Sequence, residues 1–476
     1  MPDSFHDDFL DADLGDVRRD RSLVRLAAKL ADAPVLSISA ACGSWRDVQS
    51  ALRLLNAPKT TPAAILAPHR EAVVARAAAH PCVLVVQDTT ELDFTHMKAM
   101  RGCGPLNSLS RKGLFLHSLF TITEAGLPLG LLGADIAARS AALFGKSAAR
   151  ADVRIEEKES FRWVQGYLRT QELALRLPGC EVISLNDREG DIYEVFVAWK
   201  EALEAGGPCA EWIIRANRDR ALEGLAVDAP KKLFAALEAA PALGCVQFHM
   251  TAKTAKKKVK GSTVQKRRSA RIVRQTVRAM AITPRVPERR GHKLPEVTFW
   301  AVLAEETDPP PGEDPVRWLL LTSKPVETLE AAQRILACYL RRWDIEVFHR
   351  VLKTGCRVET IQLKAEQAVR NCITLYAILA TRILHLTHLG RQCPELPVSA
   401  VFEEAEWRGT CAVAAFRGKK EAPNQEPTLG EFMALVARFG GHLGRKSDGP
   451  PGAQSIWQGL ARVRDFACGW EAAQKS

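Results

Sequence analysis

The chain has 476 residues, 47% of them hydrophobic, and a formal net charge of +11. This length exceeds what one hydrophobic core usually organises, so it predicts roughly two to four domains. The sequence has no run of about eighteen apolar residues, and the acidic segment from Met1 to Asp16 lacks the basic and apolar parts of a signal peptide. These features argue against a membrane span and predict a cytoplasmic protein. The excess of positive charge indicates a polyanionic partner.

The twelve cysteines are scattered along the chain. None forms a C-x-x-C pair, and none has a histidine nearby at zinc-ligand spacing. We therefore expect reduced thiols rather than disulfides or a structural metal.

A basic helix is predicted near the N-terminus. Asp16 is a suitable N-cap, and the apolar residues after it recur at helical spacing, at Leu23, Leu26, Ala27 and Leu30. The first turn carries Arg18 and Arg19, which either form a solvated helix face or contact DNA. Further helices are expected from Trp45 to Leu55 and from Pro62 to His80.

Two apolar runs of strand length each end in an aspartate. Asp88 follows Val83 to Gln87, and Asp187 follows Glu181 to Asn186. Continuous apolar runs of this length are typical of buried strands, so each aspartate is expected at a strand end. Taken alone, each is either an ordinary turn residue or a functional carboxylate. Other strands are expected from Leu114 to Thr123, from Leu127 to Asp135 and from Trp212 to Ile214, and a helix from Ser160 to Leu177.

The region from about 220 to 315 has a different character. It contains a very basic tract from Lys253 to Arg278, in which Val273, Val277 and Met280 indicate a β-ribbon. Strands are expected from Val297 to Leu303 and from Trp318 to Leu321. A charge run can be a solvated face, but this density of cations in a strand context favours contact with phosphates.

A long helix is predicted from Thr328 to Lys353, because this segment contains no Pro or Gly and begins with Thr328 as an N-cap. On such a helix Tyr339, Arg342, Glu346 and Lys353 would share one face, within roughly 60° of arc. That face is either the solvated side of an amphipathic helix or a metal ligand placed beside phosphate-binding cations. The opposite face would bury Ile345, Phe348 and Leu352.

The remaining chain is mostly helical. An apolar helix is predicted from Glu366 to Leu389, another from Leu429 to Phe439, and a last one after Trp457. A terminal helical piece of this kind can serve as a dimerisation surface.

Three segments together resemble the signature motifs of the DDE transposases of bacterial insertion sequences, in the insertion-sequence-four group that contains transposon Tn-five. They are Gln87-Asp88-Thr89-Thr90, Asp187-Arg188-Glu189-Gly190-Asp191, and Tyr339-x-x-Arg342-x-x-x-Glu346-x-x-x-x-x-x-Lys353. The resemblance extends to Leu14-Gly15-Asp16, to the segment from Trp318 to Glu327 and to the segment from Ala437 to Gly441. It spans nearly the whole chain.

The resemblance implies an α/β fold: a ribonuclease-H-like catalytic core with a β-rich insertion, flanked by N-terminal and C-terminal helical domains. The implied division is a DNA-binding domain at about 1–70, a catalytic domain at about 71–370 with its insertion at about 220–315, and a dimerisation domain at about 371–476. Asp88, Asp187 and Glu346 would bind two Mg²⁺ ions, or Mn²⁺ as a substitute. Such paired hard cations activate a water or a 3′-hydroxyl and stabilise the leaving oxygen of a phosphodiester.

The same resemblance implies roles for residues outside the triad. Tyr339, Arg342 and Lys353 match positions that contact phosphates, and Trp318 matches an aromatic that stacks on a flipped base. Arg215 and Arg350 are further expected DNA contacts, together with Arg18 and Arg19. Position 350 is Arg where Lys is commoner, which keeps the charge but changes its geometry.

The implied activity is cut-and-paste transposition in the bacterial cytoplasm, at the nucleoid. Two subunits would hold double-stranded transposon ends and target DNA in a synaptic complex, with nicking, hairpin formation, hairpin opening and strand transfer. Two alternatives remain at this point: a cleavage-inactive DNA-binding regulator of transposition, and a plain ribonuclease-H-like nuclease without strand transfer.

Overall fold

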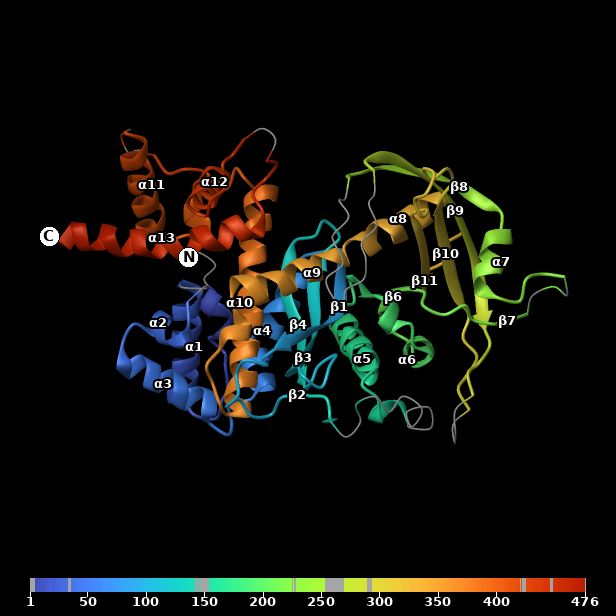
Figure 1. The fold of residues 1–476 in the computed structure, drawn as a ribbon, viewed down its shortest axis with the longest axis horizontal. Helices are drawn as coiled ribbons and strands as arrows, with labels where there is room; N and C mark the ends of the chain where they lie inside the picture. The colour runs from blue at the N-terminus through green and yellow to red at the C-terminus, as the bar shows by residue number, and fades with distance from the viewer. Residues whose placement is uncertain are drawn as a thin grey trace. The chain divides into compact units, whose positions relative to one another are not determined.

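The computed structural model describes residues 5–475 apart from 33–35, 142–143, 145–153, 225, 227, 253–268, 289–292, 420, 422–424 and 446–447. The chain divides into two compact units. Unit 1 consists of Met1–Lys146 and Trp343–Ser476, and unit 2 consists of Ser147–Arg342. Figure 1 shows the elements of both units. The domain division at about residues 70 and 370 stays a prediction.

Unit 1 begins with helices, as predicted. After a 3₁₀ turn at Phe5–Phe9 come α1 (Val17–Asp32), α2 (Ile38–Cys42), α3 (Trp45–Asn56) and α4 (Pro62–Ala77). The Arg18 N–H donates to Asp16 Oδ1 at 2.8 Å, which confirms the predicted N-cap of α1. The expected apolar face of α1 is also confirmed, because its buried residues are Leu23, Leu26, Ala27 and Leu30.

The strands of unit 1 are antiparallel and centred on β3. They are β1 (Cys82–Asp93), β2 (Gly104–Pro105), β3 (Lys112–Thr123) and β4 (Pro128–Ala137). β3 pairs with each of the others, and nearly all of its residues are buried. Helices α4 and α10 contact β4 and cover this part of the sheet. The two strands predicted between Leu114 and Asp135 are confirmed.

The C-terminal part of unit 1 is helical. It contains α9 (Trp343–Arg350), α10 (Glu366–Gln392), α11 (Glu404–Gly418), α12 (Leu429–Phe439) and α13 (Ala453–Lys475). The predicted bounds of α12 are confirmed, whereas α11 was not predicted. By length and composition α10 is able to cross a membrane, but 78% of its most apolar window is buried inside the protein. It contacts α3, α4, β4, α12 and α13, and is therefore packed as a core helix (Figure 1).

Unit 2 begins with α5 (Phe161–Arg176), β5 (Glu181–Asn186), α6 (Tyr193–Glu204) and β6 (Glu211–Arg215). β5 has the predicted bounds and runs parallel to β6. An aromatic cluster fixes α6 on these strands: the Phe196 ring lies 4.9 Å from Trp212 and 4.6 Å from Phe299. All three side chains are buried, so this cluster is the core of the unit.

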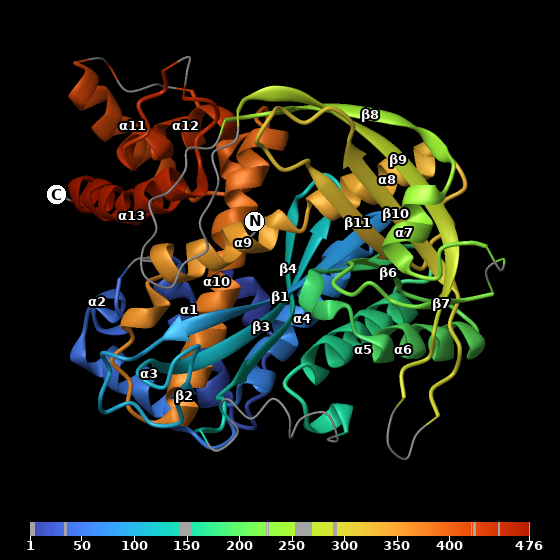
Figure 2. The same cartoon turned by 45° about the vertical axis from the view of Figure 1, so that its right-hand side comes forward.

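The β-rich insertion comes next in unit 2. It comprises β7 (Leu222–Glu223), α7 (Leu233–Ala239), β8 (Ala242–Met250), β9 (Arg271–Pro284) and β10 (Phe299–Glu306). After the insertion, the unit ends with β11 (Arg317–Thr322) and α8 (Leu329–Leu340). β6, β11, β10, β9 and β8 pair in this order with antiparallel neighbours (Figure 2). The β structure predicted at Val273 and Val277 is confirmed, because both residues lie in β9. Residues 253–268 of the basic tract lie outside the described residues.

All twelve cysteine thiols are free, and six of them are buried. Burial raises the pKa of the Cys356 and Cys372 thiols. These side chains therefore act as small, protonated packing groups.

Candidate active site

Asp88 lies in the middle of β1 rather than at its end, so the predicted strand end is wrong. The fully buried part of β1 ends at Gln87, as expected, but the strand continues to Asp93. Pairing with β3 persists through this extension, and Asp88 lies opposite Ser118. The physical reason is that Thr89 and Thr90 are β-branched and favour a half-buried strand after the apolar run.

Helix α9 packs on the face of the sheet that carries Asp88. The Phe348 ring lies 5.2 Å from Phe120, and His349 Nε2 lies 3.4 Å from Ser118 Oγ. Ser118 is paired with Asp88, and Phe120 is two residues further along β3, so their side chains share one face of the sheet. Glu346 precedes His349 by three residues and lies on a similar side of α9. Unit 1 thus places Asp88 and Glu346 on the same side of β1.

The long helix predicted from Thr328 to Lys353 is interrupted, so that prediction is wrong. α8 ends at Leu340 and α9 begins at Trp343. Between them, the Arg341 and Arg342 N–H groups donate to carbonyls three residues earlier, at 3.1 and 3.0 Å. This tight turn ends the helix without Pro or Gly. A π-helical turn at Val351–Gly355 then follows α9.

The interruption separates the four motif side chains into two groups. Tyr339 and Arg342 belong to unit 2, whereas Glu346 and Lys353 belong to unit 1. The prediction that all four side chains share one helix face within roughly 60° of arc is therefore wrong. The alternative of a solvated face is wrong too, because Tyr339 is 4% and Arg342 8% exposed. The predicted burial of Ile345, Phe348 and Leu352 is confirmed.

Asp187 lies at the centre of a cationic cluster in unit 2. It follows β5 as predicted, and its Oδ1 accepts the Glu189 N–H at 2.8 Å. Burial raises the pKa of Asp187, although this N–H and the positive charges of Arg342 and Arg215 act in the opposite direction. Burial also lowers the pKa of Arg215, with repulsion from Arg188 in support. One carboxylate thus shares its surroundings with three arginines.

The Tyr339 hydroxyl belongs to the same cluster. It is buried and has no hydrogen-bond partner among the described residues. Burial raises the pKa of Tyr339 to about 12, against the positive charges of Arg342 and Arg215. A buried polar atom without a partner is costly and points to a ligand. A phosphate oxygen is a suitable acceptor for this O–H group.

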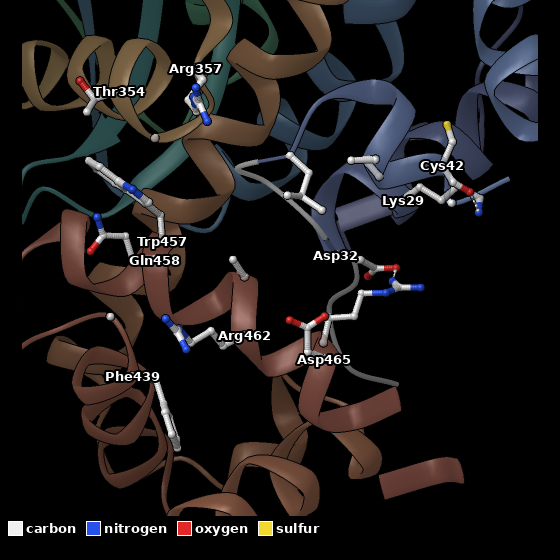
Figure 3. Close-up of a pocket in the computed structure, with 18 of the residues that line it drawn as sticks. Lys29, Asp32, Cys42, Thr354, Arg357, Phe439, Trp457, Gln458, Arg462 and Asp465 are labelled. Carbon is white, nitrogen blue, oxygen red and sulfur yellow. Dashed lines mark hydrogen bonds and ion pairs between the residues drawn. The ribbon is translucent and has the colours of Figure 1, made fainter. Parts of the chain in front are cut away.

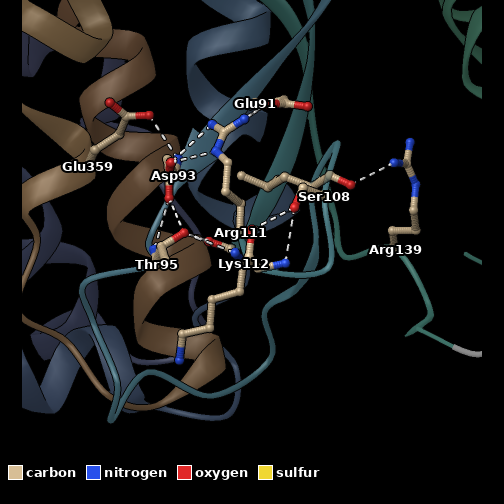
Figure 4. A network of polar contacts seen from close by, with 10 residues as sticks. Glu91, Asp93, Thr95, Ser108, Arg111, Lys112, Arg139 and Glu359 are labelled. Carbon is tan, nitrogen blue, oxygen red and sulfur yellow. Dashed lines mark hydrogen bonds and ion pairs between the residues drawn. The ribbon is translucent and has the colours of Figure 1, made fainter. Parts of the chain in front are cut away.

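A second polar cluster in unit 1 contains Glu91, Asp93, Arg111 and Glu359 (Figure 4). Lys353 lies near the carboxylates of this cluster. Burial lowers the pKa of its ammonium group, while the negative charges of Glu359 and Glu91 raise it. Arg111 joins this network through Glu91 Oε2 at 3.2 Å and Asp93 Oδ2 at 3.0 Å. The Asp93 N–H also donates to Glu359 Oε1 at 2.8 Å. Glu91, Asp93 and Glu359 are the three carboxylates of this network.

The sequence analysis missed Glu91, Asp93, Arg111 and Glu359. The sequence did contain one signal. Glu91 and Asp93 are polar residues on either side of the apolar Leu92, and such alternation is typical of a strand that continues beyond Asp88. The other two come from a hairpin and from a segment far along the chain, and no spacing rule connects them to β1.

Trp318 on β11 stacks against Phe248 on β8, with ring centroids 6.3 Å apart and planes at 19°. The register places both rings on one face of the sheet. Phe248 pairs with Val273 on β9, and Val277, four residues further along β9, lies on the same face. Val277 pairs with Ala304 on β10, and Ala304 pairs with Trp318. The indole is half-buried. Phe248 is a further residue that the sequence analysis did not identify.

The other predicted DNA contacts are Arg215, Arg350, Arg18 and Arg19. Arg215 is the last residue of β6 and belongs to the Asp187 cluster. Arg350 is exposed at the end of α9, and Arg18 and Arg19 lie in the first turn of α1. Their roles stay predictions.

The three predicted metal ligands are all carboxylates, and this donor set fits a hard divalent cation such as Mg²⁺ or Mn²⁺. Unit 1 supplies Asp88 and Glu346, and unit 2 supplies Asp187. The described residues contain no group of three or more His, Cys, Asp or Glu side chains placed to hold a metal.

The mixed α/β fold, the β-rich insertion and the flanking helical parts define a ribonuclease-H-like transposase. Three protein-family models match the chain in succession. They describe a transposase DNA-binding domain at residues 2–60, a transposase DDE domain at 199–382 and a Transposase Tn5 dimerisation domain at 378–475. The chain belongs to the Tn5-like DDE transposases, which bind DNA, form homodimers and generally use divalent metal ions. The matched DDE segment includes Glu346 and begins after Asp88 and Asp187.

Proposed function

We propose that this transposase performs cut-and-paste transposition with Asp88, Asp187 and Glu346 as the ligands of two Mg²⁺ ions, for which Mn²⁺ can substitute. The packing of α9 on the Asp88 face of β1 carries the proposal, because it places two carboxylates on one side of a buried sheet. Hydrogen bonds from well-packed neighbours hold such ligands in fixed orientations. The bound ions supply Lewis-acid activation of the attacking oxygen and stabilisation of the leaving oxygen.

Four chemical steps follow from this assignment. Water first attacks the phosphorus at the transposon end, its oxygen bonds to phosphorus, and the 3′-oxygen leaves and takes up a proton. The freed 3′-hydroxyl attacks the opposite strand to form a hairpin, and water opens that hairpin. In the last step the same 3′-hydroxyl attacks target DNA. Each step exchanges one phosphodiester P–O bond for another P–O bond, so no redox partner is needed.

The protein side chains bind and position the DNA in these steps. Arg342 and the Tyr339 hydroxyl would hold a phosphate beside Asp187, since Arg forms paired hydrogen bonds to phosphate and the hydroxyl has no partner in the described protein. Lys353, Arg215 and Arg350 would contact neighbouring phosphates, and Arg18 and Arg19 would contact the transposon end. Trp318, braced by Phe248, would stack on a flipped base. In the synaptic dimer each subunit would cut the end that its partner binds.

The decisive experiment is cleavage and strand transfer on a labelled duplex taken from the DNA that flanks the gene, with Mg²⁺ present or chelated. The variants are Glu346→Ala and, as a control, Glu330→Ala, which removes an exposed carboxylate from the first turn of α8. We expect Mg²⁺-dependent nicks, hairpins and transfer products in the wild type and in the control, and none in Glu346→Ala.

Two other outcomes separate the alternatives. End binding without any product in all three proteins would favour the cleavage-inactive regulator. Nicks without hairpin or transfer products would favour a plain nuclease.

A further inference from the structure

A groove of about 990 Å³ is lined entirely by residues of unit 1. Its walls come from α1 and α2, from the end of the π-helical turn and the residue Arg357 after it, and from α12 and α13 (Figure 3). Four cations and two carboxylates line it. The cations are Lys29, Arg357, Arg462 and Arg464, and the carboxylates are Asp32 and Asp465.

Arg357 has a backbone conformation that an arginine rarely adopts. Its φ of 51° and ψ of 38° are left-handed, and it follows the C-terminus of the π-helical turn, where glycine is usual. Arg357 and Lys419 are the two non-glycine residues with positive φ in the described chain. A left-handed arginine is strained relative to glycine. Arg357 thus has a strained backbone and an exposed side chain, and it lines the groove.

The four lining cations differ in how far they are neutralised. Lys29 Nζ lies 3.2 Å from Asp47 Oδ2 and donates to the Cys42 carbonyl at 2.9 Å. Arg464 pairs with Asp32, which ties α13 to α1. For the Arg357 and Arg462 guanidinium groups, by contrast, the described residues provide no hydrogen bond or ion pair. Asp465 is the remaining carboxylate, so these two arginines leave a surplus of positive charge.

A row of cations on α1 leads to this groove. Arg21 and Arg25 are exposed and precede Lys29 by two turns and one turn of the helix. Residues four positions apart lie on one face of a helix, so this row forms a continuous basic ridge. The α1 segment also lies within the part of the chain that matches the transposase DNA-binding family.

We propose that the groove binds the phosphate backbone of DNA, with Arg357 and Arg462 each contacting a phosphate of a strand that continues from the basic ridge of α1. Guanidinium groups without protein partners suit phosphate oxygens, which accept paired hydrogen bonds from Arg. This inference rests on the proposed binding of transposon ends. It adds that one DNA strand contacts both helix α1, which lies in the part matched to a DNA-binding domain, and Arg357, which follows α9.

The test is DNA binding by the full chain, measured by fluorescence anisotropy on the flanking-DNA duplex over a range of salt concentrations. Each phosphate contact contributes about 0.9 to the slope of log K against log salt concentration. We expect Arg357→Gly and Arg462→Ala each to reduce that slope by about 0.9, and the double variant to reduce it by about 1.8. Arg357→Lys keeps the cation and is expected to keep the slope. Lys475→Ala removes an exposed cation from the same helix as Arg462 and is the matched control.

Arg357→Gly also distinguishes binding from a structural role. Glycine relieves the left-handed strain, so Tm is expected to stay equal or to rise while DNA affinity falls. A lower Tm together with an unchanged slope would overturn the proposal. The proposal would also be overturned if Arg357→Gly and Arg462→Ala both kept the wild-type slope of log K against log salt concentration. If the wild-type chain failed to bind the duplex at all, the proposed end binding would fail rather than the groove alone.

Discussion

The predicted catalytic residues fall into two halves that differ in charge. In unit 2, Asp187 is surrounded by Arg188, Arg215 and Arg342. In unit 1, Lys353 lies among acidic side chains that include Glu91 and Glu359. The unit 2 half is therefore arranged to attract phosphate, whereas the unit 1 half offers carboxylates of the kind that cations bind.

The difference shows that one sequence motif can serve two environments. Tyr339 and Arg342 precede the break between α8 and α9, and Glu346 and Lys353 follow it. Before the break, the side chains are buried and one hydroxyl has no partner among the described residues. After the break, Lys353 lies near carboxylates whose negative charges raise its pKa against the effect of burial. Mutations in the two halves should therefore differ in kind as well as in size.

After the complete loss of products expected for Glu346→Ala, the largest effect is expected in the unit 2 half, for Arg342→Ala. Loss of one preorganised cation at a reacting phosphate costs about 10²–10³-fold in rate. Because Arg342 also lowers the pKa of Asp187, its loss should move the acid limb of the cleavage pH profile to higher pH. Arg342→Lys, which keeps the charge but not the planar fork, should restore the acid limb and only part of the rate. Single-turnover cleavage over a pH series measures both the cleavage rate and the position of the acid limb. Equal rates in Ala and wild type would remove Arg342 from the phosphate site.

His349 gives the unit 1 half a pH dependence of its own. Burial lowers its pKa to about 3, whereas an unfolded histidine titrates near 6.5. Since the folded pKa is the lower one, His349 stabilises the fold above about pH 6.5, and this contribution declines as pH falls toward 3. The decline approaches about 1.4 kcal/mol per pH unit.

Urea unfolding of His349→Gln between pH 7 and 4.5 tests this dependence. The stability of wild type relative to the variant should fall by about 2–3 kcal/mol over that range. A difference that does not change with pH would show that His349 does not titrate in this window.

A smaller effect of mixed sign is expected for Tyr339→Phe. The free protein should become more stable by about 1 kcal/mol, because a buried hydroxyl without a partner is removed. Affinity for the end duplex should fall about fivefold, the cost of one hydrogen bond in the complex. Chemical denaturation and anisotropy give the two values. A loss of stability without a loss of affinity would assign the hydroxyl to the fold instead.

The smallest effect is expected for Arg111→Ala in the unit 1 network. Its ion pairs with Glu91 and Asp93 are close, but the Arg111 side chain is 42% exposed. Solvent screening limits such pairs, so the free energy of unfolding should fall by less than about 1 kcal/mol. The difference from wild type should shrink in about 1 M salt. Arg101→Ala, at another exposed cation, should leave stability unchanged. A loss above about 2 kcal/mol, or one that salt does not reduce, would make this network part of the core.

Much of the local structure was predictable from the sequence. The bounds of β5 and α12, the N-caps of α1 and α8, and the buried residues of α1 agree with the structure. These features depend on apolar periodicity and on capping side chains, which act within a few residues. The family followed from three short motifs, and the matches to transposase families confirm it.

Only the tertiary structure decided how the motif residues are grouped. The break at Arg341 and Arg342 is not marked by Pro or Gly. The β-branched Thr89 and Thr90 favour a longer β1, and pairing with β3 continues through this extension to Asp93. The network of Glu91, Arg111 and Glu359 joins segments that are far apart in the chain. The sequence alone determined which residues carry charge and where helices with a capping side chain, such as α1 and α8, begin. Which charges meet was decided by packing, because long-range contacts depend on the whole fold and leave no local pattern.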